Sequence, residues 1–189
     1  MVLVTGGAGF IGSVLVSRIL ATTDWKVIVM DNLMHDGRAG MLHFLNHPDR
    51  FSFKREDIRT MDYKVLDSCD YVVNLAALVG EPLCKKNEDE AWHVNYDAAV
   101  RLALECNHHL VKRYLFSSTC SNYGVKKELA TELDELNPVS LYAETKVETE
   151  RVIFGMDSTA TDVTIMRFAT AFGLSLRNRF DLLLQEFIK

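Results

Sequence analysis

The first twelve residues constrain the fold of this chain more than any other segment. Residues 2–4 are aliphatic, and the turn that follows carries Gly6, Gly9 and Gly12 at the spacing Gly-x-x-Gly-x-x-Gly. An aliphatic run without alternation predicts a strand that is buried on both faces. From Phe10 onward, apolar residues fall at helical spacing. The segment therefore predicts a strand, a tight turn and a helix whose free N–H groups and dipole favour a phosphate.

Strand-like and helix-like segments alternate along the rest of the sequence. Further strands are expected at residues 26–30, 51–55, 71–75, 114–117 and 163–168. Helices are expected at residues 10–21, 41–46, 61–66, 87–109, 140–154 and 181–189. This alternation predicts an α/β fold: a three-layer, doubly wound parallel sheet of six strands with helices on both faces. Partial polar alternation in 51–55 places that strand at a sheet edge, and the polar residues 124–137 predict a surface loop.

Composition and charge exclude several classes of protein. The 189 residues are 48% hydrophobic, which is enough for one domain with a sizeable core. The net charge of −5 comes without a Lys/Arg stripe, so we expect neither nucleic acid nor a membrane as partner. A first strand without a preceding signal peptide predicts a cytoplasmic location. No metal site is expected, because four scattered cysteines without metal-ligand spacing predict free thiols, at Cys69, Cys84, Cys106 and Cys120.

An acidic residue follows the second expected strand. Asp31 lies 19 residues after Gly12, where a carboxylate can accept both ribose hydroxyls of an adenosine and repel a 2′-phosphate. The glycine turn and Asp31 together predict NAD rather than NADP as cofactor. Arg38, in the loop that follows, is the nearby cation that argues for NADP, and a simple turn cap is the structural alternative for Asp31.

Asp57 and Ile58 follow the third expected strand at the same sheet edge. Ligands of doubly wound sheets bind at this edge. Asp57 is a candidate acceptor for an adenine amino group, and Ile58 for packing against the ring. Alone, the pair would be interpreted as an ordinary loop.

A cluster of hydroxyl groups and a Tyr/Lys pair supply the candidate chemistry. Thr119 lies in the hydroxyl-rich run that ends the fifth strand, and Tyr142 and Lys146 are four residues apart on an expected helix. Residues at this spacing share a helix face. A neighbouring ammonium lowers the pKa of a phenol from about 10, which would make Tyr142 a general base for a substrate hydroxyl oriented by Thr119.

A second Tyr-x-x-x-Lys pattern, Tyr123 and Lys127, shows that the pattern alone is weak. Gly124 follows Tyr123 in a passage from strand to loop, so no helix is expected to bring that pair together. An amphipathic helix with a buried Tyr and a solvated Lys is the structural alternative for Tyr142 and Lys146.

Several motifs occur in order over nearly the whole chain. They are Thr5-Gly6-Gly7-Ala8-Gly9-Phe10-Ile11-Gly12, Asp31-Asn32-Leu33, Asp57-Ile58, Asn74-Leu75-Ala76-Ala77, Ser118-Thr119 and Tyr142-x-x-x-Lys146. In this set the sequence resembles the extended short-chain dehydrogenase/reductase family, the NAD-dependent sugar-nucleotide epimerases and dehydratases. The resemblance implies a Rossmann fold and a nucleotide-sugar substrate.

The resemblance also assigns roles. It implies that Tyr142 is the catalytic base, that Lys146 is its partner and a ligand of the nicotinamide ribose, that Thr119 contacts the substrate hydroxyl, and that Asn95 supports a proton relay. Asn95 is otherwise a surface helix residue. The cofactor-binding residues implied are Gly6, Gly9, Phe10, Ile11, Gly12, Asp31, Asn32, Asp57, Ile58, Leu75, Ala76, Ala77, Tyr142 and Lys146.

Domain organisation and assembly follow from the same resemblance. We expect residues 1–170 to form the NAD-binding Rossmann domain and residues 171–189 to begin an incomplete substrate-binding domain, with Arg177, Asn178 and Arg179 at its start. Members of the family are usually much longer, so the chain is expected to be truncated. The family implies a homodimer through helices 87–109 and 140–154.

Two local departures bear on the reaction. The sugar 4,6-dehydratases of the family carry Thr-Asp-Glu where this chain has Thr119-Cys120-Ser121, which disfavours elimination of water. Leu174 replaces the proline that usually follows Gly173. The sequence therefore predicts an NAD-dependent nucleotide-sugar epimerase or a related oxidoreductase. A non-catalytic NAD-binding sensor and an NADP-dependent reductase of the same fold remain as alternatives.

Overall fold

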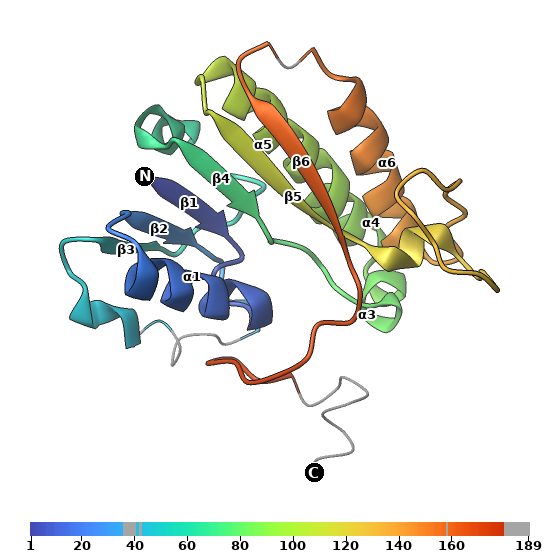
Figure 1. Cartoon of the computed structure of the whole chain (residues 1–189), viewed down its shortest axis with the longest axis horizontal. Helices are drawn as coiled ribbons and strands as arrows, with labels where there is room; N and C mark the ends of the chain where they lie inside the picture. The colour runs from blue at the N-terminus through green and yellow to red at the C-terminus, as the bar shows by residue number, and fades with distance from the viewer. Residues whose placement is uncertain (36–40, 42, 158, 180–189) are drawn as a thin grey trace.

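The structure is a computed structural model that describes residues 1–35, 41, 43–157 and 159–179. Its six strands are β1 (Val2–Thr5), β2 (Val27–Met30), β3 (Phe51–Lys54), β4 (Tyr71–Asn74), β5 (Arg113–Thr119) and β6 (Asp162–Phe168). All five neighbouring pairs are parallel, in the order β3-β2-β1-β4-β5-β6 (Figure 1). This is the doubly wound order of the Rossmann fold. The strands β2 and β3 are added on one side of β1, and β4, β5 and β6 are then added on its other side. The expected fold and the edge position of β3 are confirmed.

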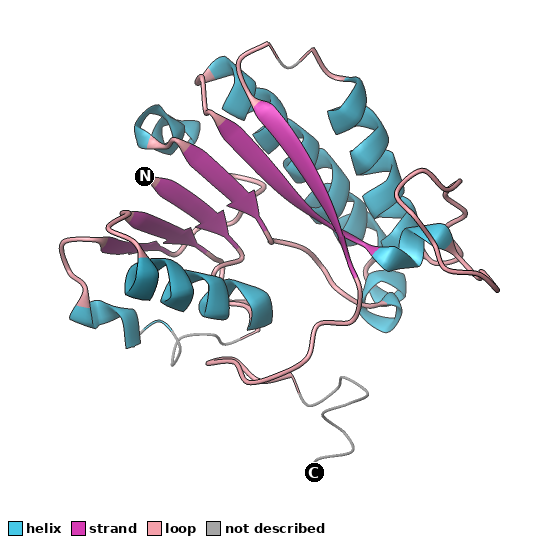
Figure 2. Cartoon of the chain, in the orientation of Figure 1, coloured by secondary structure: helices cyan, strands magenta, loops and turns pink. Residues whose placement is uncertain are grey.

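Helices cover both faces of the sheet. They are α1 (Phe10–Thr22), α3 (Glu81–Lys86), α4 (Glu88–Trp92), α5 (Ala98–His108) and α6 (Leu141–Gly155). Short 3₁₀ segments occupy His43–Asn46, Tyr63–Ser68 and Cys120–Tyr123, and a π-helical turn occupies His93–Asp97. Figure 2 shows α1 in front of the sheet and the helices from α4 to α6 behind it.

Alternating side chains of the central strand build the two cores. Val2 and Val4 point to one face, where they pack with α1 and the His43–Asn46 turn. Leu3 points to the other face, where it belongs to a cluster with α5 and the Tyr63–Ser68 turn. Parallel strands buried on both faces are apolar throughout, as the sequence of β1 indicates. The two cores fix the sheet and therefore the position of its carboxyl edge.

The structure corrects three of the expected helices. The helix expected at 87–109 is interrupted by the π-helical turn. Where helices were expected at 41–46 and 61–66, the structure has 3₁₀ segments at His43–Asn46 and Tyr63–Ser68. Such short segments carry too few periodic residues to separate α from 3₁₀ geometry. The two-turn helix α3 was not predicted. The helix expected at 181–189 and the loop with Arg38 lie outside the described residues.

A buried ion pair joins the ends of β5, β6 and α6. The Glu150 carboxylate, 4% exposed, accepts hydrogen bonds from Arg167 Nη2 at 2.7 Å and from Asn122 Nδ2 at 2.8 Å, and also from the Ser118 hydroxyl. Arg167 in turn donates to the Tyr123 hydroxyl at 2.9 Å. Because each charged group has its partner, the cost of burying both is offset.

We predict that Glu150→Ala destabilises the fold by about 1–3 kcal/mol, because the buried Ser118 and Asn122 lose their acceptor and the partly buried Arg167 loses its carboxylate. Glu148→Ala is the matched control on the same helix, since Glu148 pairs with Arg151 at the surface; its expected effect is below about 1 kcal/mol. Urea unfolding followed by circular dichroism measures both. Equal effects of the two variants would contradict the prediction.

Candidate active site

One cavity of about 770 Å³ lies along the carboxyl edge of the sheet and is lined by residues that follow every strand. The order of the strands explains its place, because parallel strands end at one edge and the crossover between β1 and β4 leaves a crevice there. Of the residues predicted from the sequence, all but Asn95 line it: Gly6, Gly9, Phe10, Ile11, Gly12, Asp31, Asn32, Asp57, Ile58, Leu75, Ala76, Ala77, Thr119, Tyr142 and Lys146.

Close backbone contacts shape the glycine turn. Gly6 has φ +69°, and a Cβ there would lie 2.6 Å from the Ala76 nitrogen. A Cβ on Gly12 would lie 2.5 Å from the Gly6 carbonyl oxygen. Gly9 takes the N-cap position of the 13-residue helix α1 and offers no side chain to cap it. The helix N-terminus therefore opens into the cavity, and its free N–H groups fit a dinucleotide diphosphate.

Asp31 ties the glycine turn to the end of β2. Its Oδ2 accepts a hydrogen bond from the Ala8 N–H at 3.0 Å, and its Oδ1 accepts one from the Leu33 N–H at 2.8 Å. Each carboxylate oxygen accepts two hydrogen bonds at full capacity. Asp31 thus keeps acceptor capacity at the cavity wall, where the sequence places a ribose.

Asp57 holds a network of its own. Its carboxylate accepts hydrogen bonds from Asn32 Nδ2 at 3.0 Å and from the Arg59 side chain at 2.8 and 2.9 Å, and Arg59 also pairs with Glu90. The hydrogen bonds from Arg59 hold the pKa of Asp57 well below its usual range despite partial burial. An adenine amino group that bound Asp57 would have to share the carboxylate with Asn32 and Arg59. Neither Arg59 nor Glu90 was predicted from the sequence.

Thr119, Tyr142 and Lys146 meet at the other end of the cavity. Thr119 ends β5, and its hydroxyl accepts a hydrogen bond from the Ser121 N–H at 3.1 Å. Lys146 Nζ donates to the Ser117 carbonyl at 2.9 Å and lies 5.9 Å from the centroid of the Tyr142 ring. The shared helix face predicted for the Tyr/Lys pair is confirmed, because both residues lie on α6.

The predicted direction of the Tyr142 pKa is wrong for the chain without ligands. Burial of the phenol raises the pKa of Tyr142 to about 12. Lys146 is completely buried, and the loss of hydration lowers its own pKa to about 8. The loss of hydration destabilises the phenolate more than the positive charge of Arg179 stabilises it. The sequence did not predict this degree of burial.

Asn95 lies behind the cavity rather than in its wall. The side chain is fully buried in the π-helical turn, where Oδ1 accepts from the Leu78 N–H at 2.8 Å and Nδ2 donates to the Leu78 carbonyl at 3.0 Å. Nδ2 also lies 3.2 Å from the Thr145 hydroxyl, which donates to the Tyr142 carbonyl. Asn95 therefore joins the segment after β4 to α6, and the surface alternative is excluded.

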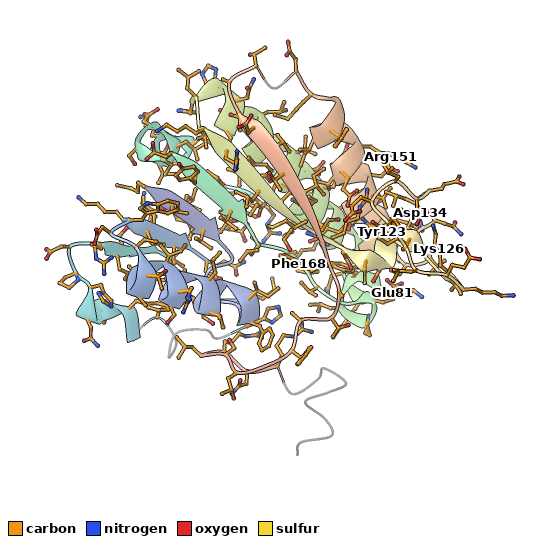
Figure 3. The ribbon with its side chains drawn as sticks, in the orientation of Figure 1. Glu81, Tyr123, Lys126, Asp134, Arg151 and Phe168 are labelled. Carbon is orange, nitrogen blue, oxygen red and sulfur yellow. The ribbon has the colours of Figure 1, made fainter. Side chains whose placement is uncertain are left out.

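The second Tyr-x-x-x-Lys pattern forms no pair, as expected. Tyr123 ends a 3₁₀ turn, and its ring lies beneath the Lys126 ammonium and the Arg167 guanidinium. Lys127 is exposed in the loop that follows. Figure 3 shows Tyr123 among Lys126 and Asp134, on the outer side of α6.

The segment after β6 crosses back to the glycine turn. The Ser175 hydroxyl donates to the Phe10 carbonyl at 2.8 Å and lies 3.0 Å from the Ser13 hydroxyl. Arg177 Nε donates to the His35 carbonyl at 3.4 Å, and Arg177 and Arg179 both line the cavity. The sequence named these arginines but gave no signal that a serine 165 residues from Phe10 would anchor them.

The fold and the site define a nucleotide-binding Rossmann protein of the short-chain dehydrogenase/reductase type. Residues 2–188 match the NAD dependent epimerase/dehydratase family. The chain belongs to this family.

Similar proteins are epimerases of nucleotide sugars. A Bacillus subtilis (strain 168) protein named as an uncharacterized UDP-glucose epimerase, YtcB, is 32% identical over 100% of this chain and 61% of its own length. The UDP-glucose 4-epimerase of Halalkalibacterium halodurans is 37% identical over 80% of this chain and 44% of its own length. The chain therefore spans less than two thirds of the length of each of these relatives.

A solved structure agrees closely with the fold. The UDP-glucuronic acid 4-epimerase from Bacillus cereus, in complex with NAD, superimposes with a TM-score of 0.89 at 29% identity. The match covers 99% of this chain and 61% of that chain. None of the described helices is long and apolar enough to cross a membrane.

We predict that Lys146→Met stabilises the chain at pH 7 by roughly 1–3 kcal/mol, because a methionine fills the same space without a buried charge. From pH 8 to 10.5 the unfolded chain binds more protons at Lys146 than the folded chain does. The free energy of unfolding of the wild type therefore rises relative to that of the variant as the pH rises through this window, and the difference between the two shrinks. Urea unfolding at pH 7 and pH 10 measures the gap, and a gap that is constant or grows with pH would contradict the prediction.

Proposed function

We propose that this chain binds NAD in the cavity and is the cofactor-binding part of a nucleotide-sugar 4-epimerase. The observation that carries the proposal is the shared cavity: the glycine turn and Asp31 line one end, and Thr119, Tyr142 and Lys146 line the other. A diphosphate at the N-terminus of α1 and a ribose at Asp31 would orient a dinucleotide along the edge of the sheet.

The residues at the far end fit proton transfer from a sugar hydroxyl. Thr119 would hold the hydroxyl, and the Tyr142 phenolate would take its proton while the Lys146 ammonium stabilises the phenolate. Bound NAD⁺ supplies a hydride acceptor that can return the hydride to the other face of the ketone, and its positive ring favours the phenolate. Asn95 would act indirectly, by holding α6 beneath Tyr142.

The curated relatives and the residues after Thr119 support an epimerase over a dehydratase. UDP-glucose 4-epimerases are among the relatives, and the matching solved structures include both a UDP-glucuronic acid 4-epimerase and an NDP-hexosamine 5,6-dehydratase. Cys120 and Ser121 line the cavity after Thr119, where a dehydratase would carry acids for the elimination of water. We therefore propose a UDP-sugar as substrate and inversion at a single carbon as the reaction.

We also propose the domain organisation and assembly expected from the sequence. Residues 1–170 would form the NAD-binding domain, and residues 171–189 would begin the substrate-binding part; the contact of Ser175 with α1 supports a role for this segment beside the cofactor. A homodimer would form through helices 87–109 and 140–154, where Leu104 and Phe154 are 50% and 84% exposed. A cytoplasmic location agrees with the buried free thiols of Cys69, Cys84 and Cys106.

The choice of cofactor can be tested with fluorescence titrations of NADH and NADPH. We predict that the chain binds NADH at least about tenfold more tightly, because the Asp31 carboxylate repels a 2′-phosphate at a cost of about 1.4 kcal/mol or more. Asp31→Ser should narrow this preference, whereas Asp24→Ser, at an exposed site, should not. Tight NADPH binding by the wild type would instead support the NADP-dependent alternative.

The catalytic role of Tyr142 can be separated from cofactor binding. We predict that Tyr142→Phe keeps NADH affinity within about twofold but lowers epimerisation at least about 100-fold, since general-base catalysis contributes about 10²–10⁴. The measurement is conversion of UDP-glucose, with UDP-glucuronic acid as second substrate. Tyr123→Phe is the control outside the cavity. Unchanged activity of the Tyr142 variant would support the sensor alternative.

A further inference from the structure

The N-terminus of α6 is held by a carboxylate that belongs to another helix. Glu81 Oε2, from the first residue of α3, accepts a hydrogen bond from the backbone N–H of Tyr142 at 3.3 Å. The N–H of Leu141 faces the same carboxylate and helps to lower its pKa. Glu81 lines the same cavity as the Tyr142 side chain.

Glu81 completes the capping of α6. The N-cap residue Ser140 serves two other amides: its hydroxyl accepts from the Ala143 N–H at 3.2 Å, and its carbonyl accepts from the Glu144 N–H at 2.9 Å. The first N–H groups of a helix have no partner within the helix. Glu81 satisfies the N–H of Tyr142, which Ser140 leaves without a partner, and puts a negative charge at the positive end of the dipole.

The local structure fixes the position of Glu81. Gly80 precedes it with φ +94°, a conformation that L side chains rarely adopt, so the chain turns sharply into α3. Lys85, one turn later, lies 3.4 Å from Glu81 Oε1, which leaves Oε2 for α6. Burial raises the pKa of Glu81, but the hydrogen bonds from Tyr142, Leu141 and Lys85 together lower it below its usual value. Glu81 is therefore ionised at neutral pH.

Apolar packing holds the two helices together around this contact. Leu78, Cys84 and Ala91 are almost completely buried, and Leu141 and Tyr142 pack against them. This apolar cluster brings α3 against the first turn of α6. Apolar contacts alone do not fix the position of α6 along its own axis. The hydrogen bond from the Tyr142 N–H to the Glu81 carboxylate fixes the position of α6 along its axis.

From this geometry we propose that Glu81 is a positioning residue, which sets the backbone of Tyr142 and so aims its phenol at the substrate hydroxyl. The proposal rests on the function proposed above. Glu81 touches no reacting atom, and it acts through the first turn of α6. A displacement of about 1 Å in a catalytic group can cost about 100-fold in rate. Loss of the carboxylate should therefore lower the rate of the chemical step and leave cofactor binding unchanged.

Three variants of this chain separate position from charge. Glu81→Ala removes the acceptor, Glu81→Gln keeps an acceptor oxygen without the charge, and Lys86→Ala, at an exposed residue of the same helix, is the control. For each variant we would measure thermal unfolding, NADH affinity and the absorbance of bound NADH formed when NAD-loaded protein is mixed with UDP-glucose. Amide hydrogen exchange at Leu141 and Tyr142, followed by NMR, reports the contact independently of activity.

We expect Glu81→Ala to slow NADH formation at least about tenfold and to speed amide exchange at Leu141 and Tyr142 at least about tenfold, with NADH affinity within about twofold. Glu81→Gln should recover most of both losses, and Lys86→Ala should resemble the wild type. The proposal is overturned if Glu81→Ala leaves NADH formation unchanged, or if Glu81→Gln rescues neither quantity.

The outcomes also separate this proposal from the function on which it rests. If wild-type protein binds no NADH, or forms none with UDP-glucose or UDP-glucuronic acid, the proposed function fails for this chain. The amide exchange rates then test, without any activity measurement, whether Glu81 holds the backbone of Tyr142. Unchanged exchange at both amides in Glu81→Ala would refute the contact, and accelerated exchange restored by Glu81→Gln would support it.

Discussion

The close approach between the turn after β1 and the backbone after β4 sets the shape of this molecule's site. With a Cβ, Gly6 would collide with the Ala76 nitrogen and Gly12 with the Gly6 carbonyl, so the turn can close only with glycine at these positions. The closed turn leaves the N-terminus of α1 facing the crevice between β1 and β4. The other residues that line the cavity follow the neighbouring strands along the same edge of the sheet.

The far end of the site keeps charged and ionisable groups out of water. Lys146 is buried beside the Tyr142 phenol, and burial moves their two pKa values apart, to about 8 for Lys146 and about 12 for Tyr142. Isolated, such groups would destabilise the fold. The Glu150–Arg167 pair and the Glu81 cap hold α6 against the sheet on either side of Lys146, so the helix that carries these groups is fixed at several points.

Much of this could be predicted from sequence because the signals are local. Glycine spacing, an aspartate after a strand and a Tyr/Lys pair at helical spacing each fix their own neighbourhood. A parallel sheet then brings strand ends together regardless of the distance between them in the chain. The failures lie where the outcome depends on surroundings: the π-helical turn at Asn95, the short helix α3, and the burial that raises the pKa of Tyr142.

The sequence by itself determined the order of strands and helices, the doubly wound sheet and the residues that face the cavity, because periodicity and turn chemistry are properties of neighbouring residues. Only the tertiary structure decided which groups meet across the chain. Glu81 at the Tyr142 amide, Ser175 at the Phe10 carbonyl and Arg59 at Asp57 are examples. A hydrogen bond requires its two atoms at one distance and angle, and for distant residues that geometry follows from packing rather than from local pattern.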